Sequence, residues 1–429
     1  MAVALLVPTL AMANGFVLER SLISGFFSFS TFARPDVSGS NCVYLSKSTL
    51  VPTAKWQLDR MDMRTGLASV IASDPVFDIA EPAISGNWVV WQIGGDIRAK
   101  NLSTGVAKNV TNDGLTTIEI TPQISGTYVV WNSYNGTNWD VMGKNLATSQ
   151  PPFVVAGGSG DQSEPTISGL RVAYRDASAL LPAAGQIRVK TIGSSAGAKM
   201  ITNNLVEQNF PSMGDHIVAW RVLNGSGKWM IRYYNYDTDQ TVDGPTSTTQ
   251  DMQNPRVSGD RILFDYSNGT DNDTWVVDAR VSRVGLTLPF VVANSSSDDF
   301  WGRITGNNFV YLSNGYPYWA KLAVPGLTIN SLPTRIARSA RVTLVGKLTD
   351  QGLGVGGVAL RVERRSASGT WDKIASLTTA ASGAYTYKSP KNTVKTSYRI
   401  AYDGSPIFFG PTIGAHFSAV SSARVAWPR

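Results

Sequence analysis

The sequence predicts an all-β protein, a seven-bladed β-propeller followed by a β-sandwich. A Pro-x-hydrophobic-Ser-Gly turn, followed by a short apolar run that ends in an aromatic residue, occurs seven times at spacings of 40 to 47 residues. A strand-built repeat with a period in the forties is typical of propellers, and each copy predicts one blade. After residue 326 the repeat stops. Strand-like runs about 8–12 residues apart replace it, which is typical of a sandwich.

The seven copies share a proline where the first strand of a blade begins, a place where no ladder donor is yet needed. The last copy has lost this proline. An aromatic residue at all seven equivalent positions indicates a packing role, because a large side chain fills the wedge between neighbouring blades. The copies begin at Pro35, Pro82, Pro122, Pro165, Pro211, Pro255 and Gly302, and they end at Tyr44, Trp91, Trp131, Tyr174, Trp220, Phe264 and Tyr311.

Each repeat predicts four strands, and the second copy shows them most clearly at 82–85, 88–91, 96–102 and 106–110. The seventh repeat supplies only three strands before Pro325 breaks the pattern. We expect residues 16–23 to supply the missing outer strand, because closure of the ring removes open sheet edges. The predicted domains are therefore the propeller at 14–326 and the sandwich at 327–429.

Composition describes a globular chain of 429 residues, with 43% hydrophobic and 16% charged residues. No apolar run is long enough to predict a transmembrane segment. Residues 1–13 resemble a secretory signal that ends in small residues, although the first basic residue is Arg20; an apolar strand is the alternative. The single cysteine, Cys42, excludes an intrachain disulfide and predicts a buried, inert thiol.

Charge divides the two predicted domains. Residues 327–429 hold fourteen basic and four acidic residues, whereas the rest of the chain is slightly acidic. A basic module of this kind predicts attraction to an anionic surface, and plain solubility is the alternative. Nucleic acid is not an expected partner, because the chain has no arginine-rich tract.

Catalytic and metal-binding signals are weak. The chain has two histidines, His216 and His416, and His216 has no Gly-x-Ser-x-Gly elbow beside it, so a serine triad is not expected. The segment 271–273 has the Asp-Asn-Asp start of a calcium loop but lacks the glycine and glutamate that complete one. The sequence therefore predicts no catalytic residue, no metal site and no cofactor.

Ligand-binding candidates lie where strands enter the ring and in its loops. Acidic residues there could bind a sugar or a cation, and solvated loop carboxylates are the alternative. An aromatic loop at 134–139 offers a second contact surface for a carbohydrate or a protein. The candidates are Glu81, Glu164, Asp161, Asp298, Asp299, Trp301, Tyr134 and Trp139, while Arg34, Thr121, Phe210 and Asn254 occupy places equivalent to Glu81 in other repeats.

The run Pro82-Ala-Ile-Ser-Gly-Asn-Trp-Val-Val-Trp91, with Asp96-Ile97 and Asn101–Gly105 after it, resembles the TolB-like (WD40-like) propeller repeats of bacterial periplasmic and cell-surface proteins. The tail, with Gly357-Val358, the Trp371 strand and Gly383-Ala-Tyr385, resembles a bacterial Ig-like module. This resemblance implies an envelope or secreted location and an adhesive or spacer role for the tail. Lyases of this fold hold a metal through several histidines, which this ring lacks.

The sequence favours a secreted or cell-surface, non-catalytic binding or adhesion protein of a bacterium. In this hypothesis the propeller loops bind a glycan, a cell-wall polymer or an envelope protein, and the basic tail is an anchor or spacer. The alternative is a glycan-active hydrolase or lyase that uses carboxylates at the propeller channel entrance. Neither family resemblance by itself determines an activity.

Overall fold

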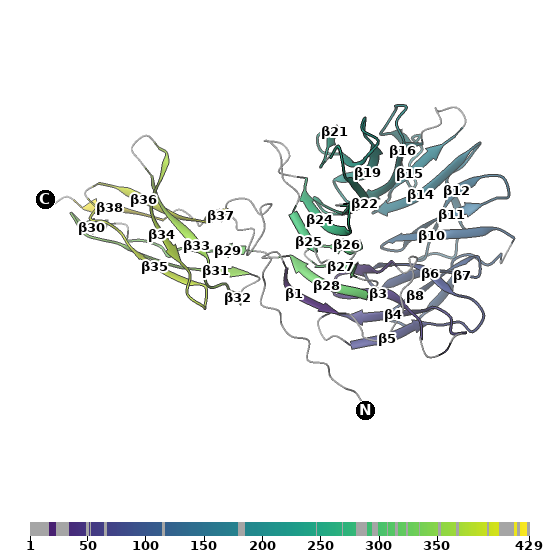
Figure 1. Ribbon diagram of the computed structural model, residues 1–429, viewed down its shortest axis with the longest axis horizontal. Coiled ribbons are helices and arrows are strands. Elements are labelled where there is room, and N and C mark those ends of the chain that lie inside the picture. Colours follow the sequence, from purple (N-terminus) through teal and green to yellow (C-terminus); the bar gives the residue numbers. More distant parts are fainter. Residues whose placement is uncertain are drawn as a thin grey trace. The chain divides into compact units, whose positions relative to one another are not determined.

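The computed structural model describes residues 17–22 and, with gaps, 34–426; the longer gaps are 179–184, 280–289, 294–298 and 403–415. Every described element is a strand, so the described chain is all-β (Figure 1). The chain falls into two compact units that divide between Ala320 and Lys321. The predicted signal segment, 1–13, lies outside the described residues.

The first unit consists of seven four-stranded sheets that follow one another along the chain. The first four sheets are β2 (Asp36–Ser38), β3 (Asn41–Ser46), β4 (Gln57–Asp62) and β5 (Leu67–Ala72); β6 (Ile79–Ser85), β7 (Trp88–Ile93), β8 (Asp96–Asn101) and β9 (Ala107–Asn109); β10 (Ile118–Ser125), β11 (Tyr128–Tyr134), β12 (Trp139–Asn145) and β13 (Phe153–Ala156); and β14 (Asp161–Ser168), β15 (Arg171–Ala177), β16 (Gln186–Thr191) and β17 (Lys199–Met200). The other three are β18 (Gln208–Met213), β19 (Ile217–Leu223), β20 (Trp229–Asn235) and β21 (Gln240–Asp243); β22 (Asp251–Ser258), β23 (Arg261–Ser267), β24 (Asn272–Asp278) and β25 (Phe290–Ala293); and β26 (Asp299–Thr305), β27 (Asn308–Ser313), β28 (Tyr316–Leu322) and β1 (Val17–Leu22).

The first strands of these sheets form a closed ring. Each of β2, β6, β10, β14, β18, β22 and β26 contacts the first strand of the next sheet, and β26 contacts β2. We call these seven the inner strands. The outer place in the last sheet is taken by β1, which comes from ahead of the first repeat. The ring is thus closed by pairing of the two ends of the repeat array.

The closing aromatic of each repeat lies in the interface between sheets, as expected from the sequence. All seven are at most 4% exposed. Trp91 packs with Leu58 of the preceding sheet, Trp220 packs with Ile187, and Tyr44 packs with Val310 across the point of closure. Burial of an aromatic side chain removes about 150–250 Å² from water, so these contacts supply much of the hydrophobic stabilisation of the ring.

A hydrogen bond between neighbouring turns explains the Ser-Gly of the repeat. The Gly86 N–H donates to the Ser38 hydroxyl of the preceding sheet at 2.9 Å, and Gly126 donates to Ser85 in the same way at 2.9 Å. Gly169 to Ser125 and Gly306 to Ser258 complete the set, at 3.0 and 2.9 Å. These glycines have φ near +58°, a conformation that side chains disfavour. We call this contact the Ser–Gly joint.

The fifth repeat replaces Ser-Gly by Gly214-Asp215 and keeps a joint of another kind. Here the Ser168 hydroxyl of the preceding sheet donates to Asp215 Oδ1 at 2.6 Å.

The seventh repeat has Gly302 in place of proline. A Cβ at Gly302 would lie 2.4 Å from Leu263 Cδ2, so a larger residue there would require the buried Leu263 side chain to move.

The second unit contains two sheets over one buried core. One sheet joins β29 (Pro325–Leu327), β31 (Thr343–Asp350), β32 (Leu353–Gly354) and β35 (Ala384–Lys388). The other joins β30 (Arg335–Ala337), β38 (Ser421–Ala426), β36 (Thr396–Tyr402), β33 (Ala359–Arg365), β34 (Trp371–Thr378) and β37 (His416–Phe417). Leu344 and Tyr385 of the first sheet pack with Leu360, Val362 and Ile400 of the second.

Two of the basic side chains that the sequence assigned to this unit are engaged internally. Glu363, which is 5% exposed, accepts from Arg399 Nε at 2.6 Å and lies 3.2 Å from an Arg361 guanidinium nitrogen. Pairing is needed for a carboxylate at this depth, because an isolated buried charge is costly. Arg361 and Arg399 therefore contribute to the core of the second unit as well as to its charge.

Removal of one Ser–Gly joint should weaken the ring by a modest amount. We expect Ser85→Ala to lower the free energy of unfolding by about 1 kcal/mol, the net value of a typical hydrogen bond. Urea unfolding followed by tryptophan fluorescence measures this change. Ser103→Ala is the matched control, since Ser103 is an exposed turn residue whose hydroxyl makes no described hydrogen bond; its effect should stay within about 0.5 kcal/mol. Equal effects of both substitutions would contradict a role for the joint.

Candidate functional site

A strained bulge recurs at the same place in six inner strands. The register of each inner strand shifts against its neighbour around the residue before the repeat's proline or, in β26, before Gly302. That residue has positive φ in every case: Glu81 (50°), Thr121 (53°), Glu164 (57°), Phe210 (52°), Asn254 (50°) and Trp301 (59°). Such a conformation costs about 1–3 kcal/mol for a residue other than glycine. Bulges of this kind redirect side chains next to functional sites. We call these six residues and Arg34, their equivalent in the first repeat, the bulge ring.

Glu81 and Glu164, both predicted ligand-binding residues, connect neighbouring members of the bulge ring. Glu81 Oε2 accepts the Thr121 N–H at 2.5 Å, and Glu164 Oε2 accepts the Phe210 N–H at 2.5 Å. Both side chains are half-buried, and burial raises the pKa of each carboxyl although the hydrogen bond opposes the rise. One oxygen of each carboxylate is therefore used to hold the ring together, which the sequence did not predict.

Trp301 lies in a cationic part of the bulge ring. The Arg34 guanidinium lies 3.5 Å from the centroid of the Trp301 ring, a close cation–π contact. The backbone N–H of Trp301 donates to Asp265 Oδ2 at 3.2 Å, and Asn254 Nδ2 donates to the same oxygen at 2.8 Å. Asp265 thus joins two members of the ring in the way that Glu81 and Glu164 join others.

Three arginines gather in this part of the ring. Arg303 Nε lies 3.6 Å from Asp36 Oδ1, and Asp36 Oδ2 accepts the Ile84 N–H at 2.8 Å. Burial and the charge of Arg303 lower the pKa of Arg34 to about 10, and burial together with Arg303 and Arg34 lowers the pKa of Arg256. Burial is the larger cause of both shifts, and the neighbouring arginines add to it, so three guanidinium groups lie close enough here to act on one another.

Arg34 and Arg256 have no carboxylate partner among the described residues. No acidic oxygen of the described chain lies within 4.0 Å of either guanidinium, and the recorded hydrogen bond of Arg256 runs to the Pro255 carbonyl at 2.7 Å. A guanidinium presents several N–H donors in a planar fork that suits a carboxylate or a phosphate. This part of the ring is therefore chemically fitted to bind an anionic group beside an indole ring.

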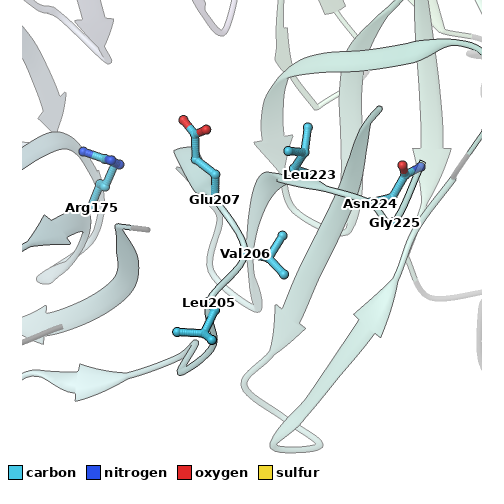
Figure 2. Close-up of a pocket in the computed structure, with 7 residues that line it drawn as sticks. All are labelled: Arg175, Leu205, Val206, Glu207, Leu223, Asn224 and Gly225. Atoms are coloured by element: carbon cyan, nitrogen blue, oxygen red, sulfur yellow. The ribbon is translucent and has the colours of Figure 1, made fainter. Parts of the chain in front are cut away.

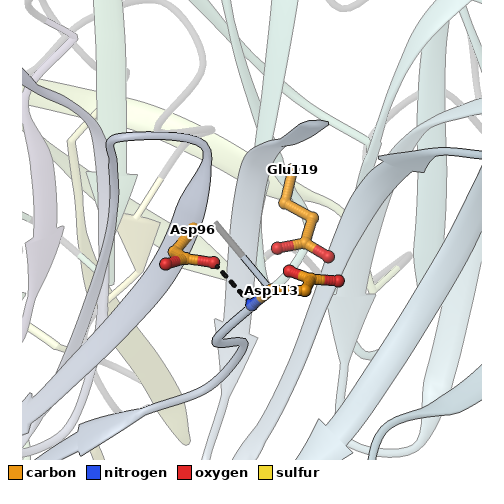
Figure 3. Close-up of side chains that lie close together, drawn as sticks. All are labelled: Asp96, Asp113 and Glu119. Carbon is orange, nitrogen blue, oxygen red and sulfur yellow. Dashed lines mark hydrogen bonds between the residues drawn. The ribbon is translucent and has the colours of Figure 1, made fainter. Parts of the chain in front are cut away.

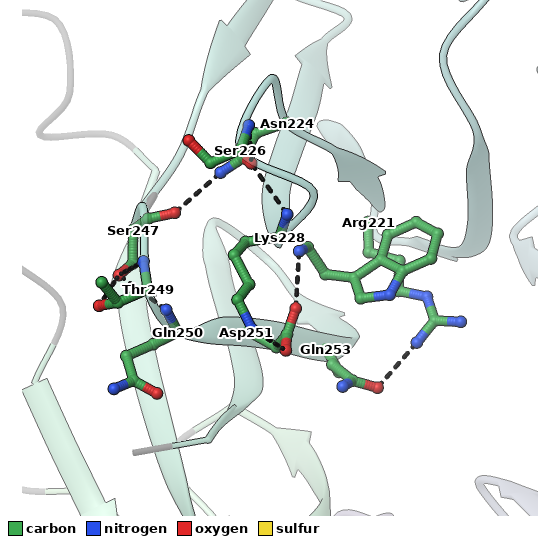
Figure 4. A network of polar contacts seen from close by, with 10 residues as sticks. Arg221, Asn224, Ser226, Lys228, Ser247, Thr249, Gln250, Asp251 and Gln253 are labelled. Atoms are coloured by element: carbon green, nitrogen blue, oxygen red, sulfur yellow. Dashed lines mark hydrogen bonds and ion pairs between the residues drawn. The ribbon is translucent and has the colours of Figure 1, made fainter. Parts of the chain in front are cut away.

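A second set of polar residues was missed by the sequence analysis. Arg175, Arg221 and Asp265 each follow the closing aromatic of a repeat. Arg221 donates from Nη1 to Gln253 Oε1 at 2.8 Å (Figure 4). Its guanidinium lies 4.4 Å from the Phe210 ring centroid. An alignment of the repeats could have found this column, because a strand position next to a buried aromatic is repeatedly polar: Gln92, Asn132, Arg175, Arg221 and Asp265.

An open cleft of about 640 Å³ lies beside this second set of residues (Figure 2). Arg175 lines it from β15, and the loop before β18 contributes Leu205, Val206 and Glu207. Leu205 is 78% exposed, so the cleft has an apolar rim with a charge of each sign beside it. Its remaining lining residues are Leu223, Asn224 and Gly225. Its volume is in the range typical of sites for small ligands.

The other predicted site residues divide into two groups. Tyr134 and Trp139 face each other across the β11–β12 hairpin with ring centroids 5.2 Å apart. The exposed Asp161 carboxylate accepts the backbone N–H of Trp139 at 3.0 Å. These three lie together and are already engaged with one another. Asp299 is the first residue of β26, opposite Ser313, while Asp298 lies outside the described residues.

The histidines form no triad in the described part of the chain. His216 is exposed, and its Nδ1 lies 3.0 Å from Asp237 Oδ2. No serine or threonine hydroxyl among the described residues is recorded as hydrogen-bonded to His216. Its surroundings thus differ from those of a catalytic base, which needs a nucleophile within hydrogen-bond reach.

No family model matches the sequence, and no curated protein matches it. Solved structures do resemble it. The β-propeller domain of the Trilobed protease from Pyrococcus furiosus matches with a TM-score of 0.51 and 8% identity, over 67% of this chain and 90% of that one. The acylaminoacyl peptidase of Pyrococcus horikoshii matches with a TM-score of 0.52 and 9% identity, over 75% of this chain and 58% of that one.

Puromycin-hydrolysing peptidases also match with TM-scores of 0.51. A TolB protein from Agrobacterium tumefaciens matches with a TM-score of 0.42 and 14% identity, over 62% of this chain and 98% of that one, and we rest no argument on it. At these identities the likeness shows the fold, which is that of a β-propeller. The described residues contain no helix that could span a bilayer.

These matches contradict the functional hypothesis drawn from the sequence. A non-catalytic binding or adhesion protein was favoured, with a glycan-active hydrolase or lyase as the alternative, whereas several of the similar structures are peptidases. The error has a physical reason. Few histidines argue against a triad within this chain, but a propeller can serve an enzyme whose catalytic residues lie elsewhere.

Burial of Asp265 should make stability depend on pH. Asp265 is 4% exposed, and burial raises its pKa to about 6, opposed by Asn254, the Trp301 N–H, Arg256 and Arg303. Between about pH 6 and 4 the folded state retains a proton that the unfolded chain releases, so this residue's contribution to stability rises as pH falls.

We expect wild type to gain about 2 kcal/mol relative to Asp265→Asn between pH 7 and 4.5, by proton linkage for a rise of about two pKa units. Urea unfolding of both proteins at the two pH values measures the difference, and the other carboxyl groups cancel because both proteins contain them. A difference that stays constant with pH would show that Asp265 titrates near its ordinary pKa.

Proposed function

We propose that this chain serves peptide hydrolysis, as a propeller that admits a peptide and holds its carboxyl terminus at the cationic part of the bulge ring. The observation that carries the proposal is the pair Arg34 and Arg256. Neither has a carboxylate partner among the described residues, the two are close enough to affect each other's charge, and Arg34 lies against the Trp301 ring. A terminal carboxylate could accept charge-assisted hydrogen bonds from these guanidinium groups. The propeller fold shared with several peptidases supports the same role.

The bulge ring offers more than one kind of contact to a peptide. Phe210 and Trp301 present aromatic rings, and Thr121 and Asn254 present polar side chains on the same set of positions. Glu81 and Glu164 use Oε2 in the ring, which leaves Oε1 of each to accept from a peptide N–H. A ring with acidic residues on one side and arginines on another can orient a peptide, because the amino and carboxyl termini of the peptide carry opposite charges.

Cleavage itself requires groups that the described residues do not bring together. We propose that a hydrolase domain or chain supplies them, and that the propeller determines which peptides reach it. The acylaminoacyl peptidase that matches is longer, since this chain spans 58% of its length. Selection by a propeller fits such an arrangement, because a narrow channel admits an extended chain and excludes folded protein.

We further propose that the seven sheets are the blades of a seven-bladed propeller, spanning residues 14–326, and that 327–429 is an Ig-like module. The closed ring of inner strands and the two sheets over one core support these assignments. The basic charge of the module favours an anionic partner. Secretion remains a prediction that rests on residues 1–13.

A test compares binding of a proline-containing tripeptide with binding of its C-terminal amide, measured by isothermal titration calorimetry on the full chain. We expect the free acid to bind at least about tenfold more tightly, because a charge-assisted hydrogen bond contributes about 1.5–3 kcal/mol. Arg256→Gln should remove this preference. Arg98→Gln, a change at an exposed arginine of β8, is the matched control and should leave it intact.

Equal affinity for the acid and the amide would contradict the proposed role of Arg34 and Arg256. Binding of neither peptide, together with no change in hydrolysis when the chain is added to a peptidase, would contradict the function as a whole. Circular dichroism of Arg256→Gln shows whether the variant keeps its sheet structure, so that a loss of preference is not mistaken for unfolding.

A further inference from the structure

Three carboxylates converge between the second and third sheets (Figure 3). Asp96 begins β8, Asp113 lies in the connection that follows β9, and Glu119 lies near the start of β10. Each offers one oxygen, and the three oxygens all lie within 4.8 Å of one another. Like charges at this separation repel, so the arrangement needs a compensating positive charge.

Glu119 is the residue that most requires a partner. It is 4% exposed, and its Oε2 has no hydrogen-bond partner among the described residues. Its other oxygen lies 3.2 Å from the Thr117 hydroxyl, whose single hydrogen is shared with Asp113 Oδ2 at the shorter distance of 2.6 Å. Buried polar atoms are almost always paired, and an unpaired carboxylate oxygen beside two further carboxylates is therefore a strong exception.

The contact between the fourth and fifth sheets is built in the same way and serves as a comparison for this site. We call the contact that contains Asp96, Asp113 and Glu119 the first joint, and the equivalent contact between the fourth and fifth sheets the second joint. In both joints a threonine hydroxyl accepts a backbone N–H from the third strand of a sheet. The Ile97 N–H donates to Thr111 Oγ1 at 2.8 Å, and the Ile187 N–H donates to Thr202 Oγ1 at 2.9 Å. In both, a loop N–H reaches the first residue of that strand, from Asp113 to Asp96 Oδ1 and from Asn204 to Gln186 Oε1, each at 3.2 Å.

The same three places hold amides in the second joint. Where the first joint has Asp96, Asp113 and Glu119, the second has Gln186, Asn204 and Gln208. Gln208 Nε2 donates to the side-chain oxygen Oδ1 of Asn204 at 3.0 Å, and Gln186 Nε2 donates to the backbone carbonyl of Asn204 at 2.6 Å. The amide N–H groups hold this joint together. A carboxylate has no such donors, so the first joint keeps the oxygens and lacks the hydrogens that would connect them.

The two joints also differ at their tryptophans. Trp220 Nε1 donates to Gln208 Oε1 at 2.9 Å, whereas Nε1 of its counterpart, Trp131, has no hydrogen-bond partner in the part of the chain that the structure describes. Glu119 therefore does not accept the hydrogen bond that its position would allow. Figure 3 shows its carboxylate directed toward Asp113 and Asp96 instead.

We propose that Asp96, Asp113 and Glu119 bind a divalent cation, Ca²⁺ in the first place, which replaces the amide hydrogens of the equivalent joint. Carboxylate oxygens are ligands of hard cations. Oxygens within 4.8 Å of one another can share the coordination sphere of Ca²⁺, because its Ca–O distances are about 2.3–2.6 Å. Mg²⁺ requires about 2.0–2.1 Å and strict octahedral geometry, which three side chains from separate segments suit less well. The Thr117 hydroxyl lies close enough to Asp113 and Glu119 to supply a further oxygen.

The bound ion would join the third strand of one sheet to the inner strand of the next, so its effect should appear in the stability of the ring. Full-length protein is treated with EDTA, and its melting temperature is measured while CaCl₂ is added. We expect a rise that grows with the logarithm of the Ca²⁺ concentration above Kd and reaches about 5 °C at a hundredfold excess over Kd. Isothermal titration calorimetry should give one site per chain, with Mg²⁺ binding at least about tenfold more weakly.

The decisive variant copies the amide joint into the acidic one: Asp96→Gln, Asp113→Asn and Glu119→Gln together. It should fold without Ca²⁺, because the chain already uses these three residues in the same geometry, and it should lose the Ca²⁺-dependent rise. Asp237→Asn with Asp243→Asn removes acidic residues from exposed positions and should keep the rise.

A wild-type melting temperature that does not respond to Ca²⁺, or a response that persists in the triple variant, would overturn the proposal. If the triple variant does not fold, the single change Glu119→Gln decides, since calorimetry must then show at least a tenfold loss of Ca²⁺ affinity. An unchanged affinity in that variant would show that Glu119 is not a ligand and would overturn the proposal.

Discussion

The ring depends on joints between inner strands, where seven sheets come closest together and few side chains fit. At the turns, a serine hydroxyl of one sheet accepts a glycine N–H of the next, as Ser38 does from Gly86. At the bulges, a carboxylate accepts the backbone N–H of a neighbouring bulge residue, as Glu81 does from Thr121. On β10 and β26 both kinds of bond occur, and they hold the inner strand on either side of the proline position while the bulge residue keeps its positive φ.

Much of this fold could be predicted from the sequence, because the pattern of Pro, Ser-Gly and aromatic residues is local and repeats. The positions of Glu81, Glu164 and Trp301 on one set of inner strands followed from the same alignment. Their partners did not, because a proline gives no sign that the residue before it has positive φ, and the Glu81 bond to Thr121 crosses between sheets. Arg175, Arg221 and Asp265 were overlooked because strand alternation was used only to find apolar positions. The function was misjudged for a different reason: a count of histidines describes one chain, whereas hydrolysis can involve groups on another.

Charge in the first unit is arranged by position in the ring. Acids on some inner strands accept backbone N–H groups, while Arg34 and Arg256 concentrate positive charge on others. The same joint between sheets can be built from amides or from carboxylates, as Gln186, Asn204 and Gln208 show beside Asp96, Asp113 and Glu119. The repeat therefore specifies the backbone of a joint, and the side chains determine whether that joint is self-sufficient or needs a ligand.

The pairing of β1 with β28 has a consequence for how the protein is made. The two strands lie about 300 residues apart, so β1 leaves the ribosome long before its partner exists and must wait unpaired while the sheets between them form. Contacts of such separation make folding slow, because the ends of a long chain must find each other. Completion of the ring is then the last step of its assembly. Until that step the free edge of β28 can accept a strand from any neighbouring chain, including the β1 of another copy.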